Sequence, residues 1–121
     1  MPLLVQDPRQ TVDAAIQSGQ SLSATLEIAG YRVAGIVMPA TWDAAALTVQ
    51  GSHDGSTFQN VYDGDGSELT IQAAASRNLT LTSVQTLALL AWKQIKIRSG
   101  TSGTPVNQTG ARTLTVVLVP A

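Results

Sequence analysis

The chain has 121 residues and a formal net charge of −1, with seven Lys and Arg against eight Asp and Glu. Charged residues make up 12% of it, about half of the ~25% typical of soluble domains. It has no Cys and one His, which excludes disulfide scaffolds, thiol nucleophiles and cysteine-based metal sites and leaves little material for a catalytic triad. We therefore expect one domain with one core that is not an enzyme and needs no cofactor.

The charges are spread along the chain without a basic patch, so we expect no nucleic-acid partner. The apolar run over residues 87–92 is far shorter than the ~20 residues of a membrane helix. Residues 1–10 lack the basic and long apolar regions of a secretory signal. These features predict a protein made in the cytoplasm with no membrane contact. Its polar positions are mostly Ser, Thr, Gln and Asn, which suits either an ordinary β-rich domain or a surface covered by partner subunits.

Extended runs separated by Gly, Asp, Pro and Ser recur about every ten residues, a spacing typical of an all-β sandwich or barrel. In chain order, we expect strands over residues 11–17, 22–28, 31–38, 47–52, 57–62, 68–72, 78–82, 94–98 and 111–119. Gly35 indicates a bulge or a close backbone approach, and Asp54-Gly55 predicts a hairpin turn. Residues 42–46 fit one helical turn, and residues 83–90 fit either a helical turn or a strand.

About eight such strands around one core predict an all-β, single-domain antiparallel β-sandwich of jelly-roll type. Residues 11–121 form this domain in our interpretation, and residues 1–10 form an extended N-terminal arm. The arm carries Leu3, Leu4 and Val5 ahead of Pro8. It either orders on a partner or frays as an ordinary terminus.

A second candidate contact segment covers residues 99–110, which are rich in Gly, Ser, Thr and Asn. Because such a long connection is unusual inside a compact domain, we expect it to be mobile or ordered by contact. The residues that we predict at a partner interface, besides the three in the arm, are Trp42, Thr101, Thr104, Pro105, Val106 and Asn107.

Two polar constellations carry alternative interpretations. Asp63, Asp65 and Glu68 offer three carboxylates to a calcium ion, with glycines that let the backbone curl, or they form a solvated acidic turn. His53 and Asp54 look like half of a catalytic pair, but adjacent strand residues point to opposite faces. We therefore interpret His53 as a residue of a hairpin tip.

The five aromatic residues are the third ambiguous set. They form a sugar-stacking platform if several are exposed together, or they pack in the core and at subunit contacts. They are Tyr31, Trp42, Phe58, Tyr62 and Trp92.

Several runs of the chain resemble a group of small proteins encoded in the structural gene clusters of tailed phages and prophages. The likeness covers residues 18–118, and its clearest runs are QSLS at 20–23, GYRVAGIVMPATW at 30–42, ALTVQ at 46–50, SHDGSTF at 52–58, KIRSGT at 96–101, PVNQ at 105–108 and RTLT at 112–115. Residues 84–92 fit this group poorly and are interpreted as an interface insertion. Residues 47–62 also resemble discoidin-type carbohydrate-binding sandwiches.

The resemblance implies a virion component with a β-sandwich fold, foremost a capsid decoration or cement protein that binds the major capsid protein. The alternatives are a head-fibre, neck or tail accessory protein, or a carbohydrate-binding module on the virion surface. In each case we expect a homo-oligomer, a dimer or a trimer, because symmetric lattices offer symmetric sites.

Overall fold

The structure, a computed structural model, describes residues 7–121. Leu3, Leu4 and Val5 of the expected arm lie outside the described residues. Eight strands and one short helix follow one another along the chain: β1 (Gln10–Ile16), β2 (Leu26–Glu27), β3 (Tyr31–Val37), β4 (Leu47–Ser52), β5 (Gln59–Asn60), β6 (Asn78–Thr80), α1 (Ser83–Leu89), β7 (Gln94–Ser99) and β8 (Arg112–Pro120). Among the residues from 7 onward, no helix has the length and apolar character needed to span a membrane.

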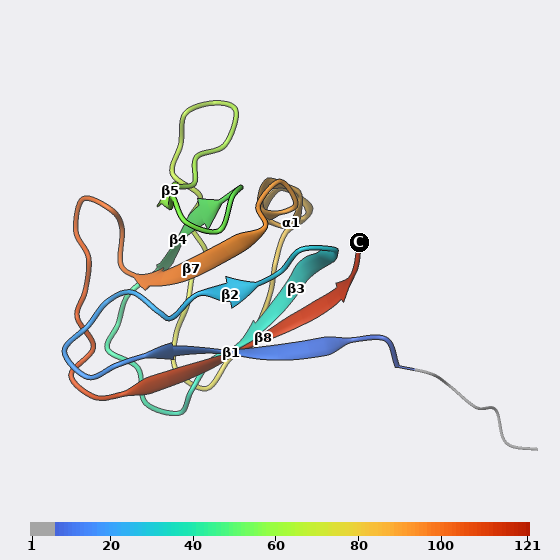
Figure 1. Ribbon diagram of the computed structural model, residues 1–121. Helices are drawn as coiled ribbons and strands as arrows, with labels where there is room; N and C mark the ends of the chain where they lie inside the picture. The colour runs from blue at the N-terminus through green and yellow to red at the C-terminus, as the bar shows by residue number, and fades with distance from the viewer. Residues whose placement is uncertain (1–6) are drawn as a thin grey trace, which may run out of the picture.

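The strands form two antiparallel four-stranded sheets with the orders β1-β8-β3-β6 and β2-β7-β4-β5. Strand 1 pairs with 8, 2 with 7, 3 with 6 and 4 with 5, which is the pairing produced when one long antiparallel ribbon is rolled into a sandwich. The prediction of an all-β sandwich of about eight strands with jelly-roll topology is confirmed. Figure 1 shows the two layers, with α1 at the end from which the loop after β5 also projects.

The core lies between the sheets and is supplied by alternate residues of each strand. In β8, Leu114, Val116 and Leu118 are buried, whereas Thr113, Thr115, Val117 and Val119 face outward. The pattern that predicted this strand therefore also predicted its inner face. A register shift between Val33 and Gly35 makes the expected bulge, and a Cβ at Gly35 would lie 3.0 Å from the Leu79 carbonyl oxygen.

Some expected elements are shorter than predicted or absent. Residues 22–28 contribute only β2 and the single bridge of Leu22 with Arg98. Residues 68–72 form no strand and touch the sheet through isolated bridges, such as that of Ile71 with Leu47. This segment crosses the end of β4 instead of running along it.

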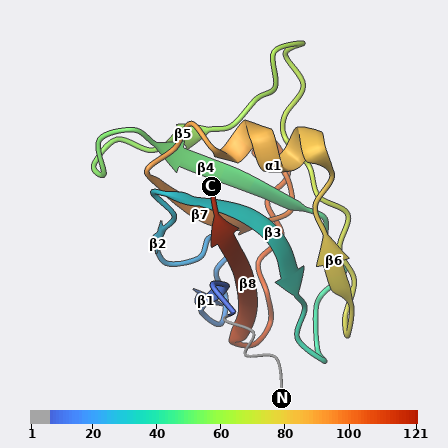
Figure 2. The same ribbon diagram turned by 90° about the vertical axis from the view of Figure 1, so that its right-hand side faces the viewer.

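Residues 42–46 form no helical turn; hydrogen bonds within the segment and to Gln108 hold them in another conformation. The Trp42 indole donates to the Ala45 carbonyl oxygen at 3.1 Å, and the backbone N–H of Asp43 donates to Oε1 of Gln108 at 2.8 Å. The ambiguous residues 83–90 do become a helix, α1. Figure 2 shows α1 above β3 and β6, close to β4.

Candidate functional site

The three candidate calcium ligands do not converge. Asp63 Oδ1 accepts hydrogen bonds from the backbone N–H groups of Asp65 and Ser67 at 2.9 and 3.0 Å and so closes its own turn. The Glu68 carboxylate lies 3.6 Å from Nη1 of Arg98 instead. Within residues 7–121 there is no group of three His, Asp or Glu side chains that could hold a metal ion. Asp63 therefore belongs to the turn, whereas Glu68 belongs to a largely buried ion pair with Arg98.

His53 lies at a hairpin tip, with a side chain that is 78% exposed and with Nε2 at 4.0 Å from the Asp54 carboxylate. Asp54 Oδ1 accepts from the backbone N–H groups of Thr57 and Ser56 and from the Ser52 hydroxyl, at 2.8 to 2.9 Å. These hydrogen bonds, that from Thr57 foremost, lower the pKa of Asp54. Asp54 thus fixes the turn at Gly55, whose φ is 86°, and it is not positioned to orient an imidazole.

The aromatic side chains do not form one exposed platform. Trp42 is 9% exposed and belongs to the core, so it offers almost no surface to a partner. Phe58 lies beneath the Lys96 ammonium, which is 4.4 Å from the ring centroid. Tyr62 is 52% exposed, and Trp92 lines a pocket of its own.

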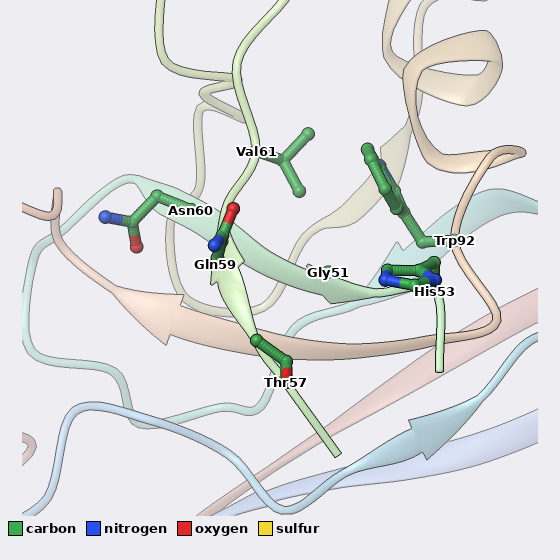
Figure 3. A pocket seen from close by; sticks show the side chains of 7 residues that line it. All are labelled: Gly51, His53, Thr57, Gln59, Asn60, Val61 and Trp92. Atoms are coloured by element: carbon green, nitrogen blue, oxygen red, sulfur yellow. The ribbon is translucent and has the colours of Figure 1, made fainter. Parts of the chain in front are cut away.

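This pocket, which we call the Trp92 slot, is a hollow of about 150 Å³ lined by Gly51, His53, Thr57, Gln59, Asn60, Val61 and Trp92. In Figure 3, the Trp92 indole and the Val61 side chain face each other across Gly51. His53 lies beside the indole, and Gln59 lies on the side of Val61. The slot thus has an aromatic wall, an aliphatic wall and a glycine floor.

Gly51 holds the aromatic wall in place. A Cβ built on Gly51 would lie 2.7 Å from Cγ of Trp92 and 3.0 and 3.1 Å from Cδ1 and Cδ2. These three distances place that point above the face of the ring, so the indole lies flat over the glycine. No other residue leaves room for this stacking.

His53, Thr57 and Gln59 supply an imidazole, a hydroxyl and an amide to the slot, and its lining residues include no Asp, Glu, Lys or Arg. Asn60 points away from the indole (Figure 3), and its Oδ1 accepts from Nη2 of Arg98 at 2.6 Å. Nε1 of Trp92 is buried without a partner in the part of the chain described. The chemistry available is stacking and neutral hydrogen bonding.

The sequence analysis included Trp92 among the aromatics but did not identify this slot. A signal was present, because Gly51 lies within the strand 47–52 on the same face as Leu47 and Val49. A glycine inside a strand indicates a close approach by another group. What it could not indicate was that the group is Trp92, 41 residues further on, brought over the strand by α1.

A second feature is a stripe of apolar side chains on α1. Val84, Leu87 and Leu90, three residues apart, are 62%, 63% and 39% exposed, and we call them the α1 stripe. The protein-facing side of the helix carries Leu89, which is buried. It also makes polar contacts: Gln85 Nε2 donates to the Thr70 carbonyl oxygen, and the Thr86 hydroxyl donates to the Val33 carbonyl oxygen. A surface helix normally buries its apolar side, whereas α1 buries Leu89 and leaves the three residues of the α1 stripe exposed.

The expected contact loop, after β7, is ordered by the chain itself. Gln108 is fully buried and donates through Nε2 to the Asp43 carbonyl oxygen and to Ser99 Oγ, at 3.0 and 2.8 Å. The pKa of the Asp43 carboxyl is lowered chiefly by the hydrogen bond from the Thr109 backbone N–H and, to a smaller extent, by the hydrogen bond from the Arg112 guanidinium. Of the predicted interface residues, Thr104, Pro105 and Asn107 are exposed, and Thr101 and Val106 are half-buried.

A buried ion pair fastens the same loop to the outside of β7. Arg98, with a side chain 8% exposed, lies beside Glu68, and the Glu68 carboxylate accepts from the Ser102 backbone N–H at 3.2 Å. Arg98 also donates to the Thr48 hydroxyl at 3.3 Å. The ion pair therefore joins the loop after β5 and the loop after β7 to one sheet.

Comparisons of the chain with protein-family models, with curated proteins and with solved structures find no match.

Proposed function

We propose that this protein is a non-enzymatic structural component of a phage virion, a decoration protein that binds the major capsid protein and stabilises its lattice. It is made in the bacterial cytoplasm and resides in the virion. The proposal is supported by the resemblance of residues 18–118 to virion proteins, by the jelly-roll topology and by a surface poor in charge. A head-fibre, neck or tail position uses the same kind of contact and differs in copy number.

The observation that carries the proposal is the α1 stripe. Residues 78–92 contain no charged side chain, so the stripe lies in a neutral surrounding. Exposed apolar groups gathered on one element are typical of protein contacts, because a monomer gains nothing from leaving them in water. A few well-packed apolar side chains provide most of the binding energy of such contacts.

The exposed part of the loop over residues 101–107 is the second contact in this proposal. It is held rigid by Gln108 and by the Arg98–Glu68 pair, so docking costs little ordering entropy. Several modest contacts of this kind sum when one molecule touches several lattice subunits, and a dimer or trimer adds to the effect.

The α1 stripe is tested with Leu87→Ser in co-sedimentation with capsids that lack the protein. Because Leu87 is exposed, we expect the variant to fold with nearly unchanged stability and to bind capsids at least ~10-fold more weakly, as for an interface hot spot. Tyr62→Ser is the matched control, because it removes an exposed apolar side chain elsewhere. Equal binding by Leu87→Ser and the parent protein would refute the role of the stripe.

The carbohydrate-binding alternative belongs to the Trp92 slot. An aromatic wall beside a hydroxyl and an amide suits a pyranose ring, whose apolar face packs on an indole and whose hydroxyls bind amides. The slot lies on the hairpin that resembles carbohydrate-binding sandwiches, residues 47–62. A glycan role therefore requires this slot, not Trp42.

Nuclear magnetic resonance tests this alternative, because the chain has two indole N–H groups, one in the slot and one in the core. Titration with glucose, galactose, mannose and N-acetylglucosamine should shift the Trp92 signal and leave that of Trp42 in place. Gln59→Ala should weaken the response several-fold, as for the loss of one neutral hydrogen bond, and Gln10→Ala should not. If the Trp92 signal responds to none of these sugars, the alternative is rejected.

A further inference from the structure

The outer face of the sheet β1-β8-β3-β6 carries exposed and half-buried side chains and has an unusual composition. Its side chains alternate with the buried ones, so they are read from the strand register. They are Thr11, Asp13 and Ala15 of β1, Thr113, Thr115, Val117 and Val119 of β8, Arg32, Gly35 and Val37 of β3, and Asn78 and Thr80 of β6. Valines, threonines and small residues thus cover most of this face.

The face has a hollow beside its strand β8. A cavity of about 400 Å³ lies over Gly35 and Ala34, with Val117 and Val119 among its lining residues. Val37 is 40% exposed. The centre of the face is therefore apolar and concave on one side of β8, which is unfavourable in water unless something covers it.

Three charged side chains lie on this face. Arg9 lines its hollow and is paired with Asp7 at 2.6 Å. Asp13 and Arg32 are exposed, and neither has an ionic partner among residues 7–121. Asp13 lies opposite Thr115 on one side of β8, and Arg32 lies opposite Val119 on the other. Val117 is midway between these two positions of β8. Asp13 and Arg32 thus lie diagonally opposite each other about Val117, and each is one strand and two residues away from it. On an ideal sheet these two residue positions are roughly 17 Å apart.

This arrangement is complementary to itself. Consider a two-fold axis that lies in the plane of contact and passes over Val117, perpendicular to the line from Asp13 to Arg32. Rotation about this axis brings Asp13 of the partner subunit over Arg32. The same rotation brings the partner's Arg32 over Asp13, so two opposite-charge contacts form at once. On the ideal sheet lattice, the partner's Thr115 falls beside the hollow at Gly35. The strands of the two sheets then cross at a large angle, as in orthogonal sheet packing.

We propose that the protein forms a two-fold dimer through this face, with Val117 at the axis and reciprocal Asp13–Arg32 pairs at the rim. A second copy is the occupant that the charges favour, because both unpaired charges find opposite partners in one symmetric contact. The inference rests on the self-association in the proposed function and identifies its interface. It leaves the α1 stripe and the Trp92 slot free.

The test exchanges the two charges. Analytical ultracentrifugation of the parent protein should show a dimer whose dissociation constant rises with salt. Asp13→Arg places Arg against Arg at both contacts, and Arg32→Asp places Asp against Asp. Each single variant should therefore dimerise at least ~10-fold more weakly, because like charges face each other. Both side chains are exposed, so both variants should remain folded.

Mixing the two single variants provides the decisive step. A heterodimer of Asp13→Arg with Arg32→Asp has an Arg against an Asp at both contacts, so the mixture should regain the parent's affinity. The controls are Asp65→Arg and Lys93→Asp, which make the same changes in charge at exposed positions outside this face. A parent protein that stays monomeric, single variants that dimerise like the parent, or a mixture that fails to associate would each overturn the inference. Capsid binding by the same variants, measured separately, shows whether decoration depends on the dimer.

Discussion

At the scale of single residues, two glycines and one buried glutamine determine how the surfaces of this protein are built. Gly51 lets the Trp92 indole lie flat over β4, and Gly35 lets β6 approach the bulge in β3. Gln108, fully buried, joins the loop after β7 to the segment around Asp43. Each of these residues fixes a surface that other residues then present to a partner.

Gly51→Ala tests the stacking that builds the Trp92 slot. The new Cβ would lie 2.7 Å from Cγ of Trp92, so the indole must shift. Overpacking of this kind should lower the free energy of unfolding by about 1–3 kcal/mol, measured by urea denaturation. Gly64→Ala is the control, because no atom lies within 4 Å of its added Cβ. Equal stability of Gly51→Ala and the control would contradict the stacking.

At the scale of elements, the two loops that flank the outside of β7 act as one unit. Glu68 comes from the loop after β5, Ser102 from the loop after β7, and Arg98 joins them from the strand. One buried ion pair therefore holds the loop after β7, which carries the predicted interface residues Thr101 and 104–107, against the sheet.

Glu68→Ala removes the carboxylate that pairs with the buried guanidinium of Arg98 and leaves this charge without its ionic partner. Breaking a buried pair on one side typically costs about 3–5 kcal/mol, and the partial exposure of Glu68 places our expectation at the low end. Arg98→Met in the Glu68→Ala background should recover part of this loss, because the uncompensated charge is gone. A double-mutant cycle by chemical denaturation measures the coupling, and simple additivity would show that the pair does not hold the loops together.

Part of the strand pattern was predictable from the sequence. β4, β7 and β8 were predicted nearly to the residue from their apolar and β-branched residues interspersed with polar ones. Residues 22–28 alternate more regularly, yet they contribute only the two-residue β2. Residues 68–72 also contain apolar residues but form only isolated bridges, of Glu68 with Tyr62 and of Ile71 with Leu47. α1 was ambiguous because its apolar residues do not share one face: Leu89 is buried, whereas Val84 and Leu87 are exposed. The Thr82–Gln85 capping box that starts it was the available signal.

The candidate surfaces were less predictable than the fold, because each depends on residues far apart in sequence. The Trp92 slot needs Gly51, Val61 and Trp92 in one place. The diagonal of Asp13 and Arg32 follows only once β1 and β3 are known to flank β8. Trp42 was predicted at an interface and packs in the core, since composition alone does not show which aromatic is covered.

At the scale of the whole molecule, the jelly roll carries three distinct surfaces. The α1 stripe and the Trp92 slot are formed by α1 and by the segment that follows it together with the hairpin of β4 and β5. The outer sheet face lies on the opposite side of the β1-β8-β3-β6 layer from the core; Figures 1 and 2 show α1 and this sheet. A molecule of this kind can pair with a copy of itself through one surface and touch a lattice with another. This division is compatible with the proposed decoration, because capsid binding and self-association would use separate surfaces.

The most direct test of the proposed function is the copy number at saturation. Purified protein is added to capsids assembled without it from the major capsid protein of the same gene cluster, and bound protein is quantified after sedimentation. Capsid decoration predicts saturable binding at a copy number comparable with that of the major capsid protein. Protein that stays in the supernatant, or that binds at only a few copies per particle, would contradict decoration and favour a neck, tail or glycan-binding role.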